Sequence, residues 1–128
     1  MKAILRKTVL VVDDDLMVRL LITSLLQEQG YAVRQASSGA SGLLMLGSAA
    51  DDIDLVLADL QMPGMSGLDF ALHARRMWPD IPVAVMTARG AVDLPPDEVA
   101  GIPLVPKPFV PEVLFAVLDS LTAVNNPA

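Results

Sequence analysis

The sequence predicts an α/β protein built as a doubly wound parallel sheet of five βα units. Two observations predict it. Short apolar runs recur along the chain, and amphipathic segments of helical length lie between them, an alternation typical of parallel sheets covered by helices on both faces. With 53% hydrophobic residues the chain is too apolar for disorder. Its 128 residues suit one domain, expected to span residues 1–128.

Five segments are predicted as strands. Four of them are apolar at consecutive positions, as expected for strands buried on both faces of a sheet. These four are Val9–Val12, Leu55–Ala58, Val83–Met86 and Ile102–Val105. The fifth, Tyr31–Ala36, alternates apolar and polar residues and is predicted as an edge strand.

Four segments are predicted as regular helices, and their apolar stripes are expected to face the core. The first carries the stripe Leu16, Leu20, Leu21, Leu25 and Leu26, with Asp15 as its N-cap and Gly30 as its stop. The second lies near residues 39–49, the third contains Leu68–Leu72 and ends at Trp78-Pro79, and the last carries apolar residues from Val113 to Val124.

A fourth helix, between the third and the last, is expected to be short or irregular. It could begin at Pro96, with Asp97 and Glu98 in its first turn. Gly101 leaves it little more than one turn.

Composition and charge exclude several classes of function. The formal net charge is −6, with nine lysines and arginines scattered along the chain. This argues against direct nucleic-acid binding through phosphate neutralisation. The absence of cysteine excludes disulfides, thiolate metal sites and cysteine nucleophiles. No targeting segment and no apolar stretch long enough for a membrane span is visible, so a cytoplasmic protein is expected.

Polar residues follow the predicted strands where those strands end. Asp13 and Asp14 follow the first strand, Asp59 the third, Thr87 the fourth, and Lys107 comes after the last. Ligands of doubly wound sheets bind beyond the carboxyl ends of the strands, where the strand order reverses. In the order 2-1-3-4-5, the first and third strands flank that point, so these side chains should converge.

Such a cluster suits phosphoryl chemistry. Three close carboxylates repel one another, and a hard divalent cation such as Mg²⁺ relieves that repulsion through oxygen ligands. One carboxylate can act as a nucleophile and form an acyl phosphate. The lysine and the metal would offset charge on the phosphoryl oxygens, and the threonine hydroxyl could donate a hydrogen bond to them.

These residues carry a resemblance to a known family. The matching motifs are Asp13-Asp14-Asp15, Asp59 with Met62-Pro63-Gly64 and Gly67, Met86-Thr87-Ala88, and Lys107-Pro108-Phe109. In this order the chain resembles, over nearly its whole length, a response-regulator receiver domain of two-component signalling, of the CheY-like superfamily. That resemblance implies a flavodoxin-like fold with strand order 2-1-3-4-5.

The resemblance also implies a role for each matching residue. Asp59 is the expected phosphoacceptor, Thr87 the switch hydroxyl, and Lys107 the phosphate-pairing lysine. The peptide bond between Lys107 and Pro108 is expected to be cis. The expected ligands of Mg²⁺ or Mn²⁺ are Asp14, Asp59 and the backbone carbonyl of Gln61, with Asp13 binding through water.

The function implied is to accept a phosphoryl group from a histidine kinase or a histidine phosphotransfer protein and to switch conformation. Only self-phosphorylation and autodephosphorylation are expected, without turnover of an external substrate. No output domain follows, so the chain is expected to be a stand-alone receiver, a phosphorelay intermediate, or the receiver portion of a hybrid histidine kinase or response regulator. Nothing in the sequence indicates an oligomeric state.

Two alternatives remain open. A degenerate receiver would bind partners without phosphorylation. A small haloacid-dehalogenase-like phosphatase would use Asp13 and Asp15, but Met17 stands where that family wants threonine or valine, and Asp59 and Thr87 would have no role.

Two departures from the family pattern concern the output face. Leu104 occupies the position, three before the lysine, that commonly carries an aromatic switch residue. The fourth helix is interrupted by Pro95-Pro96. We therefore expect output partners to use the last helix and nearby loops.

Gln61 and Arg89 each lie two residues after a site residue, at positions that tune phosphoryl lifetime in the family. We predict that Arg89→Ala changes the dephosphorylation rate, because the resemblance implies that the side chain at this position meets the attacking water. The half-life of the phosphorylated chain measures it, and an unchanged half-life would remove Arg89 from the site.

Overall fold

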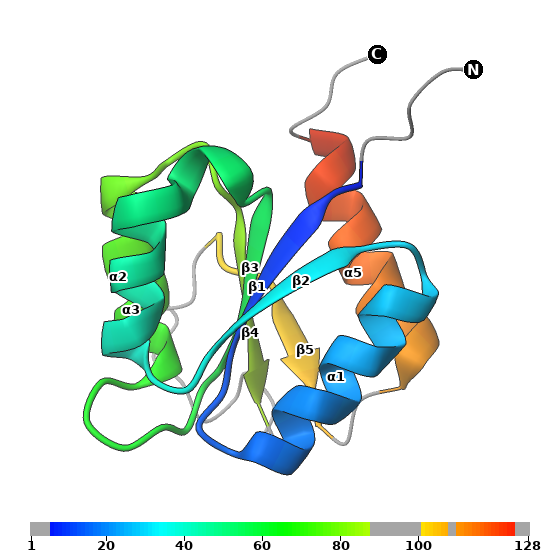
Figure 1. Cartoon of the computed structure of the whole chain (residues 1–128), viewed down its shortest axis with the longest axis horizontal. Helices are drawn as coiled ribbons and strands as arrows, with labels where there is room; N and C mark the ends of the chain where they lie inside the picture. Colours follow the sequence, from blue (N-terminus) through cyan, green and yellow to red (C-terminus); the bar gives the residue numbers. More distant parts are fainter. Residues whose placement is uncertain (1–5, 88–100, 108–109, 125–128) are drawn as a thin grey trace.

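The computed structural model describes residues 6–87, 101–107 and 110–124. At its centre lies a five-stranded sheet in the order β2-β1-β3-β4-β5 (Figure 1). The strands are β1 (Thr8–Val12), β2 (Ala32–Ala36), β3 (Leu55–Asp59), β4 (Val83–Thr87) and β5 (Leu104–Pro106). All four strand pairs are parallel. The predicted fold class and strand order are confirmed.

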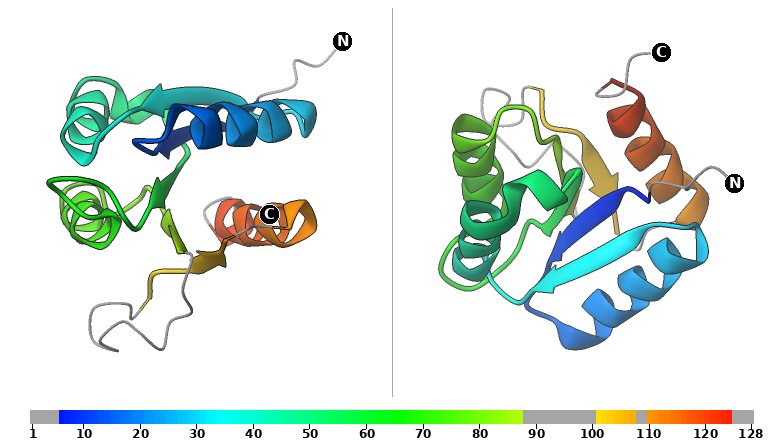
Figure 2. Two further views of the ribbon diagram at one scale, coloured as in Figure 1. Left: turned by 90° about the horizontal axis from the view of Figure 1, so that it is seen from below. Right: turned by 45° about the horizontal axis from the view of Figure 1, so that its top comes forward.

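Helices cover both faces of the sheet. They are α1 (Leu16–Glu28), α2 (Gly39–Ala49), α3 (Gly67–Met77) and α5 (Pro111–Val124), with a short 3₁₀ turn, η1 (Ala50–Asp52), after α2. Helices α2 and α3 lie on one face, and α1 and α5 lie on the other (Figures 1 and 2). The predicted fourth helix falls in residues 88–100, outside the described residues.

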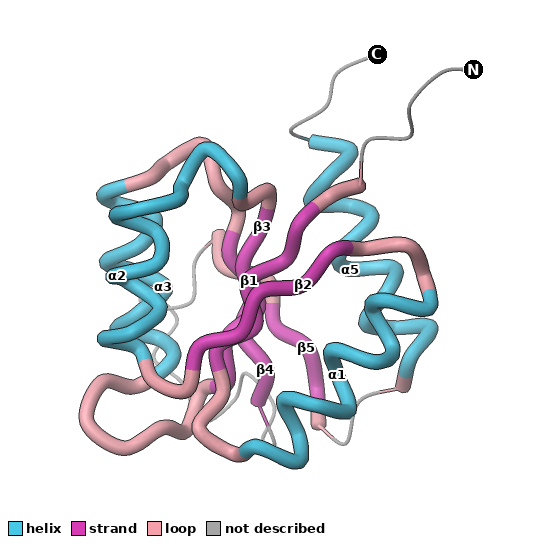
Figure 3. The backbone as a smooth tube through the Cα atoms, viewed as in Figure 1, coloured by secondary structure: helices cyan, strands magenta, loops and turns pink. Residues whose placement is uncertain are grey.

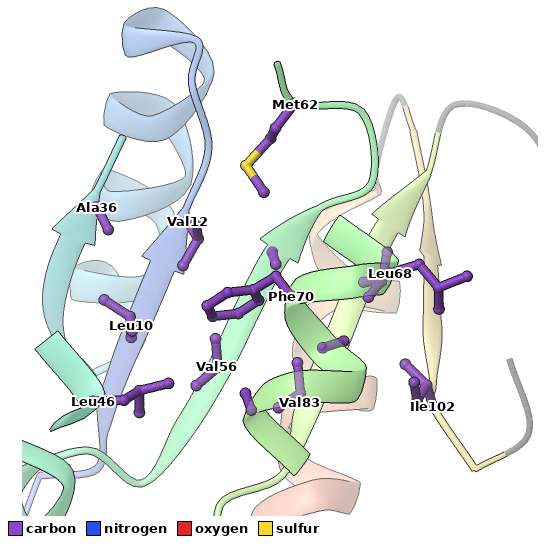
Figure 4. Close-up of a cluster of buried hydrophobic side chains, with 14 of the residues drawn as sticks. Leu10, Val12, Ala36, Leu46, Val56, Met62, Leu68, Phe70, Val83 and Ile102 are labelled. Atoms are coloured by element: carbon purple, nitrogen blue, oxygen red, sulfur yellow. The ribbon is translucent and has the colours of Figure 1, made fainter. Parts of the chain in front are cut away.

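The strands bury side chains on both faces, as their uninterrupted apolar runs predict. Alternate residues of β1 point to opposite sides, so Leu10 and Val12 pack toward α2 and α3, while Val9 and Val11 pack toward α1 and α5. Figure 4 shows the first of these two clusters, in which Phe70 of α3 lies between the strands and the helical layer. The sheet therefore separates two cores.

The apolar stripe predicted for α1 is wrong in part. Leu16, Leu20 and Leu21 are 54%, 46% and 54% exposed, and the buried residues of the helix include Ile22 and Leu26. Nearly every turn of this helix carries apolar residues on more than one side, so periodicity does not select a face. Packing against the sheet selects it, and it leaves an apolar surface in solvent. In α5, Leu114 and Leu118 are buried as predicted, but Val113 is 40% exposed.

Strand β5 begins two residues later than predicted. The parallel ladder starts with Leu104 opposite Val85 and ends with Pro106 opposite Thr87. A proline is tolerated there because β5 is an edge strand and needs no N–H on its open side. The edge position predicted for β2 is confirmed, since β2 pairs only with β1.

Loops at the carboxyl ends of β1, β2 and β3 gather at one edge of the sheet, at the bottom of Figure 3. Asp15 caps α1 as predicted, because its side chain accepts hydrogen bonds from the backbone of Met17 and Val18. Gly67 begins α3 so close to the end of β3 that a Cβ there would overlap the backbone carbonyl of Asp59. Only glycine permits this approach, which fixes the loop after Asp59.

In the described part of the chain, no helix is long and apolar enough to cross a membrane.

A hydrogen bond ties α5 to the start of β2. The hydroxyl of Tyr31, the sole tyrosine, donates to the Asp119 carboxylate over 3.0 Å. Burial, and then this hydrogen bond, raise the pKa of Tyr31 to about 12 from an ordinary 10.0. The bond therefore links two elements that are 88 residues apart in the chain.

We predict that Tyr31→Phe lowers the free energy of unfolding by about 1 kcal/mol, the net contribution of a typical intramolecular hydrogen bond. Because the folded-state pKa is raised, the wild type also loses stability as pH rises from about 10 to about 12. Urea unfolding of both proteins across this range measures both effects. An equal alkaline loss in the Phe variant would contradict the assignment.

Candidate functional site

The pairing of β1 with β3 creates the site. In the parallel register Val12 lies opposite Ala58, so Asp13 and Asp59, the next residue of each segment, emerge side by side. Parallel strands end at the same edge, and the first and third strands flank the point where strand order reverses. The site therefore lies where the sequence predicts it.

Three carboxylates meet at this edge. Oxygen atoms of Asp13, Asp14 and Asp59 all lie within 4.8 Å of one another. Asp13 and Asp59 are buried, whereas Asp14 is exposed. This arrangement offers hard oxygen ligands from inside the protein and an opening to solvent at Asp14, which is the donor set that Mg²⁺ prefers.

Asp13 is held on several sides and keeps one atom without a partner. Its N–H donates to the carbonyl of Ala36 over 3.1 Å. Its Oδ1 accepts from the N–H of Asp15 over 2.9 Å. Its Oδ2 is buried and makes no hydrogen bond. An orphaned buried carboxylate oxygen is costly without a ligand, so this cluster fits a divalent cation.

Electrostatics at Asp13 point the same way. Burial raises the pKa of Asp13, and repulsion from Asp59 and Asp14 adds to that rise. The hydrogen bond from Asp15 and the charge of Lys107 oppose it. The net upward direction means that the charged form of this carboxyl lacks compensation in the metal-free protein.

Lys107 reaches the cluster from the far side of β4. Its Nζ lies 2.9 Å from Oδ1 of Asp59, in a hydrogen-bonded ion pair that is largely buried. Its backbone N–H donates to the carbonyl of Thr87 over 2.8 Å. The residue after β5 is thus attached to the end of β4, and this attachment helps to aim the ammonium group at Asp59.

Thr87 ends β4 and is 3% exposed. It lies next to the site because Met86, the preceding residue, pairs with Asp59 in the sheet. A hydroxyl here can serve as a hydrogen-bond donor to a group placed on Asp59.

The remaining predicted residues are placed less fully. Gln61 is exposed in the loop between β3 and α3. Leu104 is partly buried, packs against the core beside α3, and begins β5. Arg89 lies outside the described residues, and so does Pro108, which leaves the predicted cis peptide bond untested.

Sequence reasoning missed Arg19. Its Nη1 donates to the backbone carbonyl of Asp13 over 2.7 Å, and its Nε donates to Oε1 of Gln35 over 3.0 Å. An arginine four residues after the cap Asp15 was the available signal, because one helical turn returns its side chain toward the end of β1.

We predict that Asp13→Asn raises the free energy of unfolding of the metal-free protein at pH 7 by about 1 kcal/mol, because it removes an uncompensated buried charge. Asparagine keeps the Oδ1 acceptor for Asp15. The raised pKa fixes the sign: the cost of the carboxylate disappears as falling pH protonates it. The gain should therefore shrink as pH falls from 7 toward 3.8, the ordinary value.

Unfolding in urea with a chelator present measures this difference. A variant less stable than the wild type at pH 7 would show that the carboxylate is compensated in the metal-free fold.

Comparisons with known proteins agree with this geometry. The profile of the response regulator receiver domain matches residues 9–119. Response regulator MprA of Mycobacterium avium is 36% identical over 124 residues, covering 93% of this chain and 52% of that protein. The chain therefore spans about half the length of this curated relative.

Solved structures resemble the chain over most of its length. A receiver domain protein from Clostridium thermocellum is 27% identical, with a TM-score of 0.85 over 92% of this chain and 95% of that one. TrrA from Thermotoga maritima, solved in complex with Mg²⁺-BeF, is 33% identical, with a TM-score of 0.80 over 90% of this chain and 98% of that one. With its sheet order, its acidic cluster and these matches, the chain belongs to the response regulator receiver domain family.

Proposed function

We propose that Asp59 is the phosphoacceptor through which this receiver takes part in two-component signalling. Membership of the family gives the phosphoryl-accepting function. The observation that carries the assignment to Asp59 is its position: a buried carboxylate at the end of β3, paired with Lys107 over 2.9 Å and within 4.8 Å of two further carboxylates.

In the proposed reaction, a carboxylate oxygen of Asp59 attacks the phosphorus of a phosphohistidine. The P–N bond breaks, the imidazole leaves, and an acyl phosphate forms on Asp59. Hydrolysis later returns the carboxylate when water attacks phosphorus, releasing inorganic phosphate. The first step consumes the phosphohistidine donor and the second consumes one water molecule, and the two steps together return Asp59 to its starting carboxylate.

The cluster would hold Mg²⁺ through Asp13, Asp14 and Asp59, together with the carbonyl of Gln61, with Asp13 bridged by water. Bound there, the cation would neutralise charge that develops on the phosphoryl oxygens. The unpartnered Oδ2 of Asp13 supports this assignment, because it is an acceptor for which the described residues supply no donor. Mn²⁺ prefers similar oxygen ligands and is an expected substitute.

Lys107 and Thr87 are proposed to respond to phosphorylation. Lys107 contacts Asp59 in the unphosphorylated chain; once Asp59 carries a phosphoryl group, the ammonium would pair with a phosphoryl oxygen instead. The hydroxyl of Thr87 would donate to the same group. Movement of these two side chains would link the chemistry to β4 and β5 and shift the conformational equilibrium. Leu104 stands where the family commonly has an aromatic switch residue, so no aromatic side chain is available at this position to report the change.

Histidine kinases phosphorylate receiver domains, and we propose that the donor here is a histidine kinase or a histidine phosphotransfer protein. The exposed apolar surface of α1 supports a protein donor. Leu16, Met17, Leu20 and Leu21 are 46% to 73% exposed. Their helix begins directly after the acidic cluster, so a protein docked on them would lie beside Asp59.

The parent protein is proposed to be a response regulator or a hybrid histidine kinase, with residues 1–128 as its receiver domain. The net charge of −6 favours protein partners for this domain over direct contact with nucleic acid. A cytoplasmic location follows from a kinase donor of this class.

We predict that acetyl phosphate with Mg²⁺ adds one phosphoryl group to the wild type, and that Asp59→Asn or removal of Mg²⁺ abolishes the adduct. Asp52→Asn is the matched control, because Asp52 is an exposed carboxylate that pairs with Arg34 away from the cluster. Intact mass measures the adduct. An adduct that persists in Asp59→Asn would place the acceptor elsewhere, and no adduct with no Mg²⁺ binding would indicate a phosphorylation-independent interaction module.

We predict that Leu20→Ser lowers the rate of phosphotransfer from a cognate histidine kinase by about tenfold, because the docked kinase loses apolar contact near the site. Phosphorylation by acetyl phosphate should stay unchanged. Leu44→Ser is the control, since Leu44 is 75% exposed on α2, across the sheet from α1. Equal slowing by both substitutions, or slowing with acetyl phosphate, would contradict docking on α1.

A further inference from the structure

Asp13 has three hydrogen-bonded attachments to the protein. Its N–H donates to the carbonyl of Ala36, its Oδ1 accepts from the N–H of Asp15, and its carbonyl oxygen accepts from the guanidinium of Arg19. The single atom left over is Oδ2, which is buried and without a partner. The hydrogen bonds to the N–H, Oδ1 and carbonyl oxygen of Asp13 therefore set the direction of Oδ2. The bond from Arg19 is the shortest of the three, at 2.7 Å.

The guanidinium of Arg19 joins three elements. It projects from α1, bonds to the residue that follows β1, and bonds to the side chain of Gln35 in β2. Both acceptors are neutral oxygens. Among the residues that the structure describes, Arg19 makes no ion pair with a carboxylate, so it leaves the carboxylate oxygens of the cluster available to a cation.

We propose that Arg19 is a positioning residue of the acidic cluster, and that it sets Mg²⁺ affinity by fixing the main chain of Asp13 and so the direction of Oδ2. This inference rests on the proposed function, because it assumes that the cluster binds Mg²⁺. Arg19 is 6 residues from Asp13 in the chain, and its two side-chain hydrogen bonds go to the Asp13 carbonyl and to Gln35 rather than to a carboxylate of the cluster.

The physical case has two parts. A carbonyl at the end of a buried strand needs a donor, and without Arg19 the Asp13 carbonyl would have to turn to find one, which would turn the carboxylate with it. Turning that carboxylate would also change the distances from its oxygens to those of Asp14 and Asp59, which in the cluster all lie within 4.8 Å of one another. Partners that orient metal ligands typically contribute about 10- to 100-fold to metal affinity.

The competing explanation is purely structural: Arg19 would tie α1 to β2 and do nothing for the cluster. The two explanations differ in one measurable quantity, which is the stability gained on adding Mg²⁺. A structural tie lowers the free energy of unfolding equally with and without Mg²⁺. A positioning residue reduces the gain itself, because the gain depends on the ratio of metal concentration to Kd.

The experiment uses Arg19→Met and Arg19→Lys in the whole chain, with Mg²⁺ titrated by calorimetry and urea unfolding measured in chelator and in 10 mM Mg²⁺, a concentration of about the order needed to saturate a millimolar site. We expect Arg19→Met to weaken Mg²⁺ binding about tenfold and Arg19→Lys to recover part of that loss. Arg34→Met is the matched control. It removes the same charge from an exposed arginine that pairs with Asp52, and should leave the Kd within about twofold.

Each result decides a specific point. An unchanged Kd in Arg19→Met, with lower stability in chelator, would make Arg19 a structural tie and overturn the inference. An equal loss of Mg²⁺ affinity in Arg34→Met would show that the change in net charge alone causes the effect, and it would also overturn the inference. Failure of the wild type to bind Mg²⁺ would instead overturn the proposed function. If Arg19→Met does not fold, Gln35→Met removes one of the two acceptors of Arg19; about threefold weaker Mg²⁺ binding would support the inference, and no change would overturn it.

Discussion

The parallel pairing of β1 with β3 is the constraint on which the site depends. It is maintained by apolar packing on both faces of the sheet. Every residue of β3 is buried, and so is every residue of β1 except Thr8. Because the two strands are parallel and pair Val12 with Ala58, Asp13 just after β1 and Asp59 at the end of β3 must meet. Burying the strands therefore also concentrates negative charge at one edge of the protein.

That concentration is unfavourable in the metal-free chain, and the surrounding structure offsets part of it. Lys107 neutralises Asp59 directly, whereas Arg19 supports Asp13 through a backbone carbonyl. What stays uncompensated is Oδ2 of Asp13. A cluster whose carboxylates still repel one another is well suited to binding a cation, because the bound cation relieves that repulsion.

The core and the edge that carries the acidic cluster were predictable because each depends on local pattern. Runs such as Leu55–Ala58 identify buried strands, and the polar residue after each run identifies the ligand-binding edge. The exposed side of α1 was not predictable, because apolar residues lie on several sides of that helix and the sequence pattern does not choose among them. Arg19 was missed for a related reason, since its acceptors lie on β2 and at the end of β1.

By itself, the sequence determined the order of the elements, the strands buried on both faces, and the identity of the acidic cluster. These follow from residue type and spacing along the chain. Only the tertiary structure decided which face of α1 is buried, which oxygen of Asp13 lacks a partner, and that Lys107 pairs with the carboxylate of Asp59. Those features depend on distances between segments far apart in the chain, such as the 48 residues that separate Asp59 from Lys107, and side-chain spacing along one segment does not encode them.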